Sequence, residues 1–198
     1  MARPAPPLRD TLRNRAAELG VPMEALEKDY ALSYLLAGIY RNEDLHSSLV
    51  FKGGTALRKA YFGDYRFSVD LDFTAVEGPR GNELEAAISD ATVVAQRLLR
   101  EQGPFSVAAT RRSEKAPYPA SQEAFQVQVG FPWHSRPVCS LKIEISTDEV
   151  LALVPARRLM LHAYEEDLSV ELRCYPIEEI AAEKLRTPAQ VQVRLDQG

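Results

Sequence analysis

The stretch RFSVDLDF, residues 66–73, alternates apolar and polar side chains as a strand with one buried face does. Its apolar residues are Phe67, Val69, Leu71 and Phe73. Asp70 and Asp72 therefore share the polar face, although aspartate is a poor strand former and neighbouring like charges repel. Because residues two apart lie about 6–7 Å from each other along a strand, the two carboxylates can converge on one ligand.

A pair of carboxylates without a nearby histidine or cysteine suits a hard cation such as Mg²⁺, which binds through one or two carboxylates plus substrate phosphates. A solvent-facing strand that happens to carry Asp70 and Asp72 is the alternative, and for an isolated D-x-D motif it is the more common case. The rest of the sequence has to decide between these interpretations.

The segment GGTALRK, residues 53–59, follows the apolar residues 49–51 and leads into a helical pattern, which predicts a strand, a tight turn and a helix start. Gly53 and Gly54 allow a ligand to approach the backbone, and Thr55 can cap the helix or bond a phosphate oxygen. Arg58 and Lys59 add positive charge one turn later. The segment lacks the P-loop spacing, and a Gly-Gly turn alone is usually only a turn.

Two further residues are candidates on weaker patterns. In SLKIEIS, residues 140–146, Glu144 lies on the polar face and can reach Asp70 and Asp72 from a neighbouring strand, although pairing with Lys142 or solvent is an equal alternative. Lys184 falls on the apolar stripe of the last predicted helix. It can reach into the site to neutralise phosphate charge, or lie on apolar surface with its ammonium in water.

The remaining patterns predict further helices and strands. Helices are expected at residues 9–20, 22–42, 82–103 and 176–186, and strands at 104–112, 123–133, 138–150 and 169–175. Pro188 should end the last helix, so residues 187–198 are expected to form a loose tail. No repeat or linker divides the chain, and we expect one domain over residues 1–198.

The composition indicates a soluble cytoplasmic protein. The chain has 198 residues with 45% hydrophobic residues, enough for one core, and no apolar run of membrane-spanning length or secretory leader. Two isolated cysteines and three scattered histidines exclude a disulfide framework and make zinc improbable. The net charge of −4 argues against a generally basic surface, although the segments RRSEK (111–115) and PARR (155–158) can supply a local basic patch.

Five segments in this order carry a family resemblance. They are EKDYALSYLLAGIY, LVFKGGTALRKAYF, RFSVDLDF, LKIEIS and IEEIAAEKLR, and together they span about residues 25–186. With them the chain resembles the AbiEii/AbiGii nucleotidyltransferase toxins, to which the mycobacterial MenT toxins are related. The resemblance implies an α+β fold, a polymerase-β-like nucleotidyltransferase core with a mixed sheet flanked by helices. It also implies the toxin of a bacterial toxin–antitoxin or phage-defence system, with a cognate antitoxin.

The resemblance also implies roles for individual residues. Asp70 and Asp72 would hold Mg²⁺, with Glu144 as a third acid and Lys184 as the lysine of the A-E-K-L motif. The residues implied at the NTP are Gly53, Gly54, Thr55, Arg58, Lys59, Arg66 and Ser68. The ions would align an acceptor hydroxyl, most simply that of tRNA, with the α-phosphate and promote release of pyrophosphate.

The sequence departs from the family pattern at its C-terminal end. Family members continue beyond A-E-K-L-R into a helical region with an R-D-x-x-D motif, whereas this chain ends with TPAQVQVRLDQG, where Asp196 is the nearest counterpart. The C-terminal helical region is therefore expected to be truncated. Two alternatives follow: a weakly catalytic nucleotide-binding pseudo-enzyme, or a nucleotidyltransferase that modifies a protein or small-molecule hydroxyl.

Overall fold

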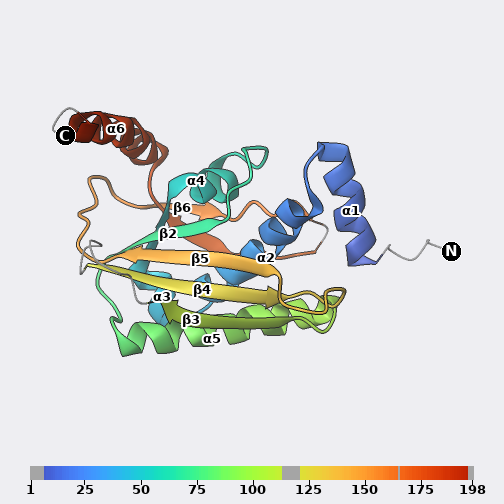
Figure 1. Ribbon diagram of the computed structural model, residues 1–198. Coiled ribbons are helices and arrows are strands. Elements are labelled where there is room, and N and C mark those ends of the chain that lie inside the picture. The colour runs from blue at the N-terminus through green and yellow to red at the C-terminus, as the bar shows by residue number, and fades with distance from the viewer. Residues whose placement is uncertain (1–6, 113–120, 165, 196–198) are drawn as a thin grey trace.

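The computed structural model describes residues 7–112, 121–164 and 166–195 (Figure 1). Its helices are α1 (Leu8–Leu19), α2 (Met23–Tyr40), α3 (Glu43–Ser48), α4 (Gly53–Ala56), the π-helical turn η1 (Leu57–Tyr61), α5 (Asn82–Leu99), the 3₁₀ turn η2 (Arg100–Gln102) and α6 (Ile177–Leu195). Its strands are β1 (Leu49–Lys52), β2 (Asp70–Ala75), β3 (Ser106–Arg112), β4 (Gln122–Gly130), β5 (Cys139–Ser146), β6 (Ala156–Leu159) and β7 (Glu171–Cys174).

The strands form one mixed sheet in the order β3-β4-β5-β2-β1-β7-β6. Strand β2 pairs antiparallel with β1 and parallel with β5, so these three strands are adjacent at the centre of the sheet. The expected α+β fold with a mixed sheet and flanking helices is thereby confirmed. None of the helices in the described part of the chain is both long enough and apolar enough to cross a membrane.

One face of the sheet is covered by α2 and α5 and forms the core. Helix α2 runs behind β5, and α5 runs along β3 (Figure 1). Leu71 and Phe73 of β2 and Leu141 and Ile143 of β5 are fully buried in this core. The polar residues that alternate with them must therefore lie on the opposite face, as the period-two pattern predicted.

The register of the central strands brings three charged residues side by side. Asp72 of β2 is directly opposite Lys52 of β1 on one side and Glu144 of β5 on the other. These residues come from segments far apart in the sequence. Only the sheet topology makes them neighbours.

Several boundaries differ from the sequence-based expectations. Strand β2 starts at Asp70, because residues 66–69 leave the sheet and run beside the Gly53–Gly54 turn. Helix α6 continues through Pro188 to Leu195, so the expected loose tail is wrong for residues 187–195. A proline inside a helix removes one hydrogen bond but can bend the helix without ending it when helix-forming residues follow. Asp196 lies outside the described residues.

Two elements were not predicted. Helix α3 is a six-residue helix whose N-cap Asn42 accepts hydrogen bonds from the amides of Asp44 and Leu45 at 3.1 Å. Strand β6 is mostly exposed and has little apolar alternation. Both are too short to show a hydrophobic period.

Gly38 sets the distance between α2 and α5. A Cβ atom at this position would overlap with the backbone carbonyl oxygen of Ala91 and lie 3.1 Å from Ala95 Cβ. We expect Gly38→Ala to destabilise the protein, because overpacking against backbone costs about 1–3 kcal/mol and alanine regains only about 1 kcal/mol of helix propensity. Urea denaturation measures the difference.

Ser89→Ala on the exposed side of α5 is the control, and its free energy of unfolding should stay within about 0.5 kcal/mol of the original. A Gly38→Ala protein as stable as the control would show that the two helices can separate without cost.

Candidate active site

The turn between β1 and α4 is held against the acidic strand. Gly53 has φ of 76°, a conformation that favours glycine, and a Cβ atom there would overlap with the Asp72 carboxylate. Two independent constraints therefore require glycine at position 53. The sequence identified this residue as a place of close backbone approach, and the first group that approaches it is the protein's own carboxylate.

The next residues of the turn contact the segment that precedes β2. A Cβ atom at Gly54 would lie 3.4 Å from Ser68 Oγ and 3.7 Å from Arg66 Nη2. Thr55 Oγ1 donates a hydrogen bond of 2.6 Å to the backbone carbonyl of Asp70. The structure thus brings together Gly53, Gly54, Thr55, Arg66, Ser68, Asp70 and Asp72, all of which the sequence proposed.

A cavity of about 390 Å³ opens beside Gly53 on the polar face of the sheet. Its lining residues are Lys52, Gly53, Asp72, Ser121, Gln122, Glu144, Ser146, Asp148, Glu149 and Glu183. Five of these side chains are carboxylates and one is an ammonium, so the cavity has a strongly negative lining. We call it the acidic cavity.

Burial and like charges perturb Asp72 strongly. Burial raises the pKa of Asp72 to about 6, with further contributions from the neighbouring carboxylates of Glu144 and Asp70. Glu144 accepts hydrogen bonds from Lys142 Nζ at 2.8 Å and from Gln122 Nε2 at 3.2 Å, which hold it beside Asp72. Glu144 therefore pairs with Lys142 and lines the acidic cavity at the same time, so the two alternatives from the sequence do not exclude each other.

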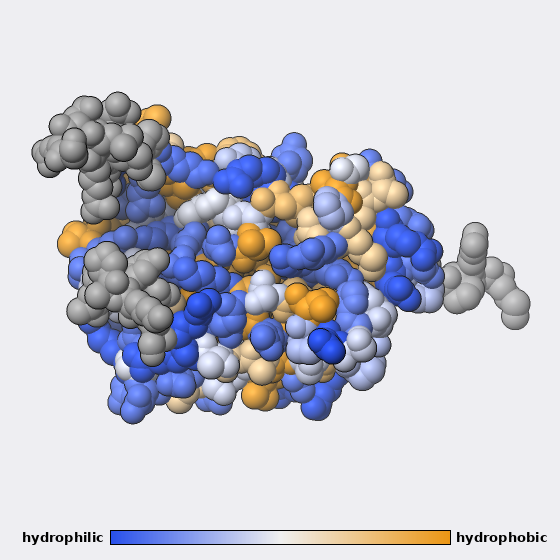
Figure 2. All heavy atoms as spheres, viewed as in Figure 1, coloured by the Kyte–Doolittle hydropathy of each residue, from blue (hydrophilic) through white to orange (hydrophobic). Residues whose placement is uncertain are grey.

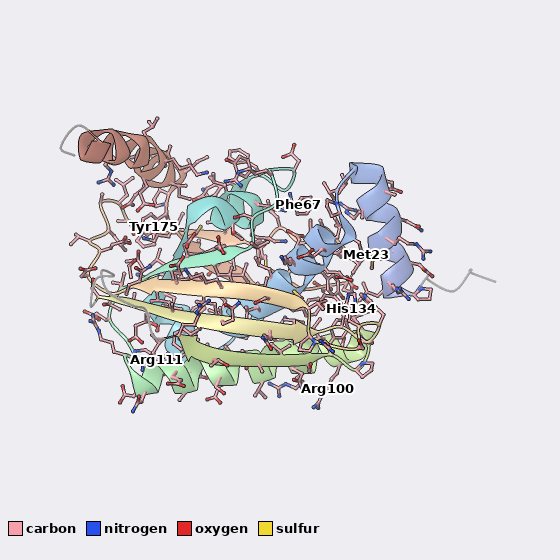
Figure 3. All side chains as sticks on the ribbon, in the orientation of Figure 1. Met23, Phe67, Arg100, Arg111, His134 and Tyr175 are labelled. Carbon is pink, nitrogen blue, oxygen red and sulfur yellow. The ribbon has the colours of Figure 1, made fainter. Side chains whose placement is uncertain are left out.

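Lys52 and Glu149 belong to the site, and the sequence analysis missed both. Lys52 Nζ donates to Glu149 Oε2, which also accepts a 2.6 Å hydrogen bond from Thr74 Oγ1. Tyr175, just before α6, lies within 2.8 Å of Thr74 Oγ1 through its hydroxyl (Figure 3). A lysine immediately before the double glycine was an available signal for Lys52.

Glu149 lies on a loop that α6 holds in place. Glu179, a buried carboxylate in the first turn of α6, accepts hydrogen bonds from the backbone amides of Ala152 at 2.7 Å and Leu153 at 3.3 Å. Buried charge-assisted bonds of this kind fix a loop well. The start of α6 therefore helps to place Glu149 over the acidic cavity.

Arg58 and Lys59 do not line the acidic cavity. Arg58 Nε lies 2.8 Å from Asp29 Oδ1 and Lys59 Nζ lies 2.9 Å from Asp29 Oδ2, and all three side chains are buried. Burial raises the pKa of Asp29, but the two cations outweigh it and hold that pKa below its usual value. In this structure both cations bind Asp29. The family resemblance had assigned them to the phosphates of the NTP.

Arg58 also supports the segment that carries Arg66 and Ser68. Its guanidinium lies 3.9 Å from the ring centroid of Phe67 and donates to the carbonyl of Tyr65. The contribution of Arg58 to the turn is therefore structural.

Lys184 is exposed on α6, whereas the helical pattern placed it on the apolar stripe. Its ammonium donates a 3.2 Å hydrogen bond to Tyr65 Oη and lies 5.3 Å from the Tyr65 ring centroid. The residue before it, Glu183, lines the acidic cavity instead. The structure thus brings Lys184 to the segment beside the Gly53–Gly54 turn and not to the carboxylates.

The donor chemistry of the site fits a divalent cation. Asp72 and Glu144 are adjacent oxygen donors, and their mutual repulsion is relieved by positive charge. Asp70 is exposed and two residues away on the same strand face. Within the described ranges no group of three or more histidine, cysteine, aspartate or glutamate side chains is gathered closely enough to hold a metal ion.

Several of the cations expected to form a basic patch already contact other side chains of the protein. Arg111 pairs with Glu123, and Arg157 lies 2.8 Å from Glu171. Lys115 lies outside the described residues. Arg112 donates to Gln126, and Arg158 lies over the ring of Tyr61.

Comparison with known families gives one match. A family model described as nucleotidyl transferase AbiEii toxin of type IV toxin–antitoxin systems matches residues 34–194. The match includes the Gly53–Gly54 turn, both aspartates of β2, Glu144 and α6 up to residue 194. No curated protein matches the chain.

We expect Asp72→Asn to increase stability at neutral pH in the absence of divalent ions. Burial in the folded state raises the pKa of this carboxyl from 3.8 to about 6, so between these values the folded state binds more protons. Stability then falls as the pH rises from about 4 to 6, and the ionised group costs about 1–3 kcal/mol above that range. Urea denaturation with EDTA should show the variant more stable by this amount at pH 7 and by much less at pH 4.

Asp70→Asn is the matched control, because Asp70 is exposed on the same strand. Its stability should change little at either pH. An Asp72→Asn advantage that is absent at pH 7, or equal at both pH values, would contradict the electrostatic origin.

We expect Asp29→Asn to destabilise the protein by about 3–5 kcal/mol, because it leaves two buried cations without their counter-ion. Chemical denaturation at pH 7 measures this loss. Glu24→Gln on the same helix is the control: it breaks an exposed pair with Lys28, and such pairs contribute less than about 1 kcal/mol. Equal small losses in both variants would show that Arg58 and Lys59 find other partners.

Proposed function

The chain belongs to the AbiEii family of nucleotidyltransferase toxins of type IV toxin–antitoxin systems, and we propose that it transfers NMP from an NTP to an RNA hydroxyl with Mg²⁺. Nucleotidyltransferase activity, an NTP substrate and an antitoxin partner follow from the family. The observation that best supports the finer proposal is the contact of Gly53 with Asp72, which joins the glycine turn to the carboxylate cluster.

Asp70, Asp72 and Glu144 are the residues that would hold Mg²⁺. The ion would supply positive charge to the triphosphate and to the attacking oxygen. The raised pKa of Asp72 is consistent with this role, because the cluster has more negative charge than its own lysines neutralise. These three carboxylates are the proposed metal ligands; in the described structure they are not gathered around one point, so the ion would have to draw them together.

The turn and its neighbours would bind the phosphates. Gly53 and Gly54 offer backbone amides at the start of α4, and Ser68 Oγ and Arg66 Nη2 lie 3.4 and 3.7 Å from the position that a Cβ atom at Gly54 would take. Thr55 already donates its hydroxyl to the Asp70 carbonyl, so its proposed role is to fix the turn against β2. Lys184 would add positive charge through its position at Tyr65.

The transfer requires an acceptor oxygen in line with the α-phosphorus. The oxygen–phosphorus bond forms as the bond from the α-phosphorus to the bridging oxygen breaks, and pyrophosphate leaves with that electron pair. The acceptor's proton passes to a carboxylate of the acidic cavity. Positioning and electrostatics supply the catalysis, because the protein forms no covalent bond in this step.

We expect label from α-³²P NTPs to enter total tRNA with Mg²⁺, and Asp70→Ala and Asp72→Asn to lower the rate at least about 100-fold, or ~3 kcal/mol of barrier. Asp90→Asn on the exposed side of α5 is the control and should transfer at the original rate. Scintillation counting of acid-precipitated RNA gives the rate and the preferred base.

Mg²⁺ binding is tested separately by thermal unfolding. Millimolar Mg²⁺ should raise the Tm of the original protein and leave that of Asp72→Asn unchanged, because binding to the native state alone stabilises it. Equal increases in Tm for both proteins would show that Mg²⁺ binds at a site that does not include Asp72.

The alternatives predict other outcomes. A pseudo-enzyme would bind NTP without releasing pyrophosphate, and a transferase acting on another hydroxyl would label protein or a small molecule but not RNA. Failure of all labelling by folded protein, with normal NTP binding, would favour the pseudo-enzyme and overturn the proposed transfer.

A further inference from the structure

A second and larger cavity shares no lining residue with the acidic cavity and approaches the Gly53–Gly54 turn through Arg66. It measures about 910 Å³ and is bounded by α1, residues 63–67 and residues 160–163. Its apolar wall includes Leu19, Val21, Met160 and Leu161. Figure 2 shows apolar residues gathered in the region of α1, bordered by hydrophilic ones. We call this cavity the α1 pocket; its volume is in the range of small-molecule sites.

The polar lining of the α1 pocket is opposite in charge to that of the acidic cavity. Its cations are Arg15, Arg58, Lys59 and Arg66, and its anion is Asp64. Arg58 and Lys59 are neutralised in part by Asp29, which leaves Arg15 and Arg66 as the cations that a ligand can reach. The pocket therefore favours a ligand that combines an apolar body with negative charge.

His162 lines the pocket, and its two ring nitrogens are buried beneath the pocket surface, where the ring packs against Tyr34 and Tyr164. Its side chain is only 6% exposed, and among the described residues neither ring nitrogen has a hydrogen-bond partner. Nε2 lies 3.5 Å from Glu166 Oε2, too far for a good bond. Buried polar atoms are nearly always hydrogen-bonded, so a ligand that offers both donors and acceptors would complete this site once the imidazole turns toward it.

Aromatic side chains line the same pocket. Tyr65 and Phe67 face it from the segment before β2, and the Arg58 guanidinium is stacked on Phe67 at 3.9 Å. Aromatic rings and guanidinium planes are the surfaces on which proteins stack unpaired bases.

Arg66 connects the α1 pocket to the phosphate cradle. It lines the pocket, and its Nη2 lies 3.7 Å from a Cβ position at Gly54. Lys184 binds Tyr65 at the same boundary. A ligand in the pocket can therefore direct a phosphate toward Arg66 and the glycine turn.

We propose that the α1 pocket binds the nucleobase of a substrate nucleotide, with the adjoining phosphate at Arg66. The base stacks beside Tyr65 and Phe67 and bonds His162 through its polar edge. The inference rests on the proposed nucleotidyl transfer. The base comes from the NTP or from the unpaired end of the RNA acceptor, and the experiment distinguishes these sources.

The test fills the pocket with Leu161→Trp and compares it with Leu159→Trp, an exposed position on β6 outside the pocket lining. Two dissociation constants are measured by calorimetry: one for non-hydrolysable α,β-methylene NTPs and one for short single-stranded oligoribonucleotides. An NTP base in the pocket predicts at least tenfold weaker NTP binding by Leu161→Trp, with oligonucleotide binding unchanged. An acceptor base predicts the reverse.

A second readout does not depend on the substitution. In the original protein, the ¹⁵N resonances of the His162 ring should shift when the ligand that fills the pocket is added. Both dissociation constants within twofold of the Leu159→Trp control, together with an unshifted His162, would overturn the proposal. Both measurements are of binding, so their outcome is separate from whether transfer occurs.

Discussion

One buried carboxylate, Asp29, ties together segments that do not meet in the sheet. It accepts from Arg58 and Lys59 of η1 and from the Tyr164 hydroxyl at 3.1 Å. Through Arg58 it also fixes the carbonyl of Tyr65 and the ring of Phe67. The two cations would be costly to bury without it, so the position of α4 and of the segment carrying Arg66 and Ser68 depends on an anion in α2. The walls of the α1 pocket depend on the same contacts.

The acidic cavity shows the opposite arrangement, in which charge is left incompletely compensated. Asp72 is held between Gly53 and Glu144 with a raised pKa, and this arrangement costs stability when the carboxyl is ionised. Sites of this kind commonly mark function, because a ligand can supply the missing charge. The Asp29 contacts therefore stabilise the fold around the α1 pocket. The acidic cavity instead retains uncompensated negative charge, which costs stability unless a cation neutralises it.

The sequence predicts the local features well and the long-range contacts poorly. Alternation correctly placed Asp72 and Glu144 on polar strand faces, but that they are neighbours follows from the parallel pairing of β2 with β5, which no local pattern encodes. The family resemblance assigned Arg58 and Lys59 to phosphates, and no local pattern revealed their pairing with Asp29, which lies in α2 about thirty residues earlier. Lys52, Glu149 and Tyr175 were missed because their interactions join β1, a loop and the start of α6.

The two cavities together constrain what can occupy the site. One is lined by five carboxylates and by Gly53, and the other contains accessible arginines with aromatic and apolar walls, one of which, Arg66, lies near Gly54. A nucleotide has the matching asymmetry, with a flat, weakly polar base at one end and phosphates at the other. Its phosphates can approach the carboxylates only when a cation lies between them, whereas its base needs no such help in the α1 pocket. Binding of the base without metal, followed by metal-dependent placement of the phosphates, is therefore the order that the charge distribution favours.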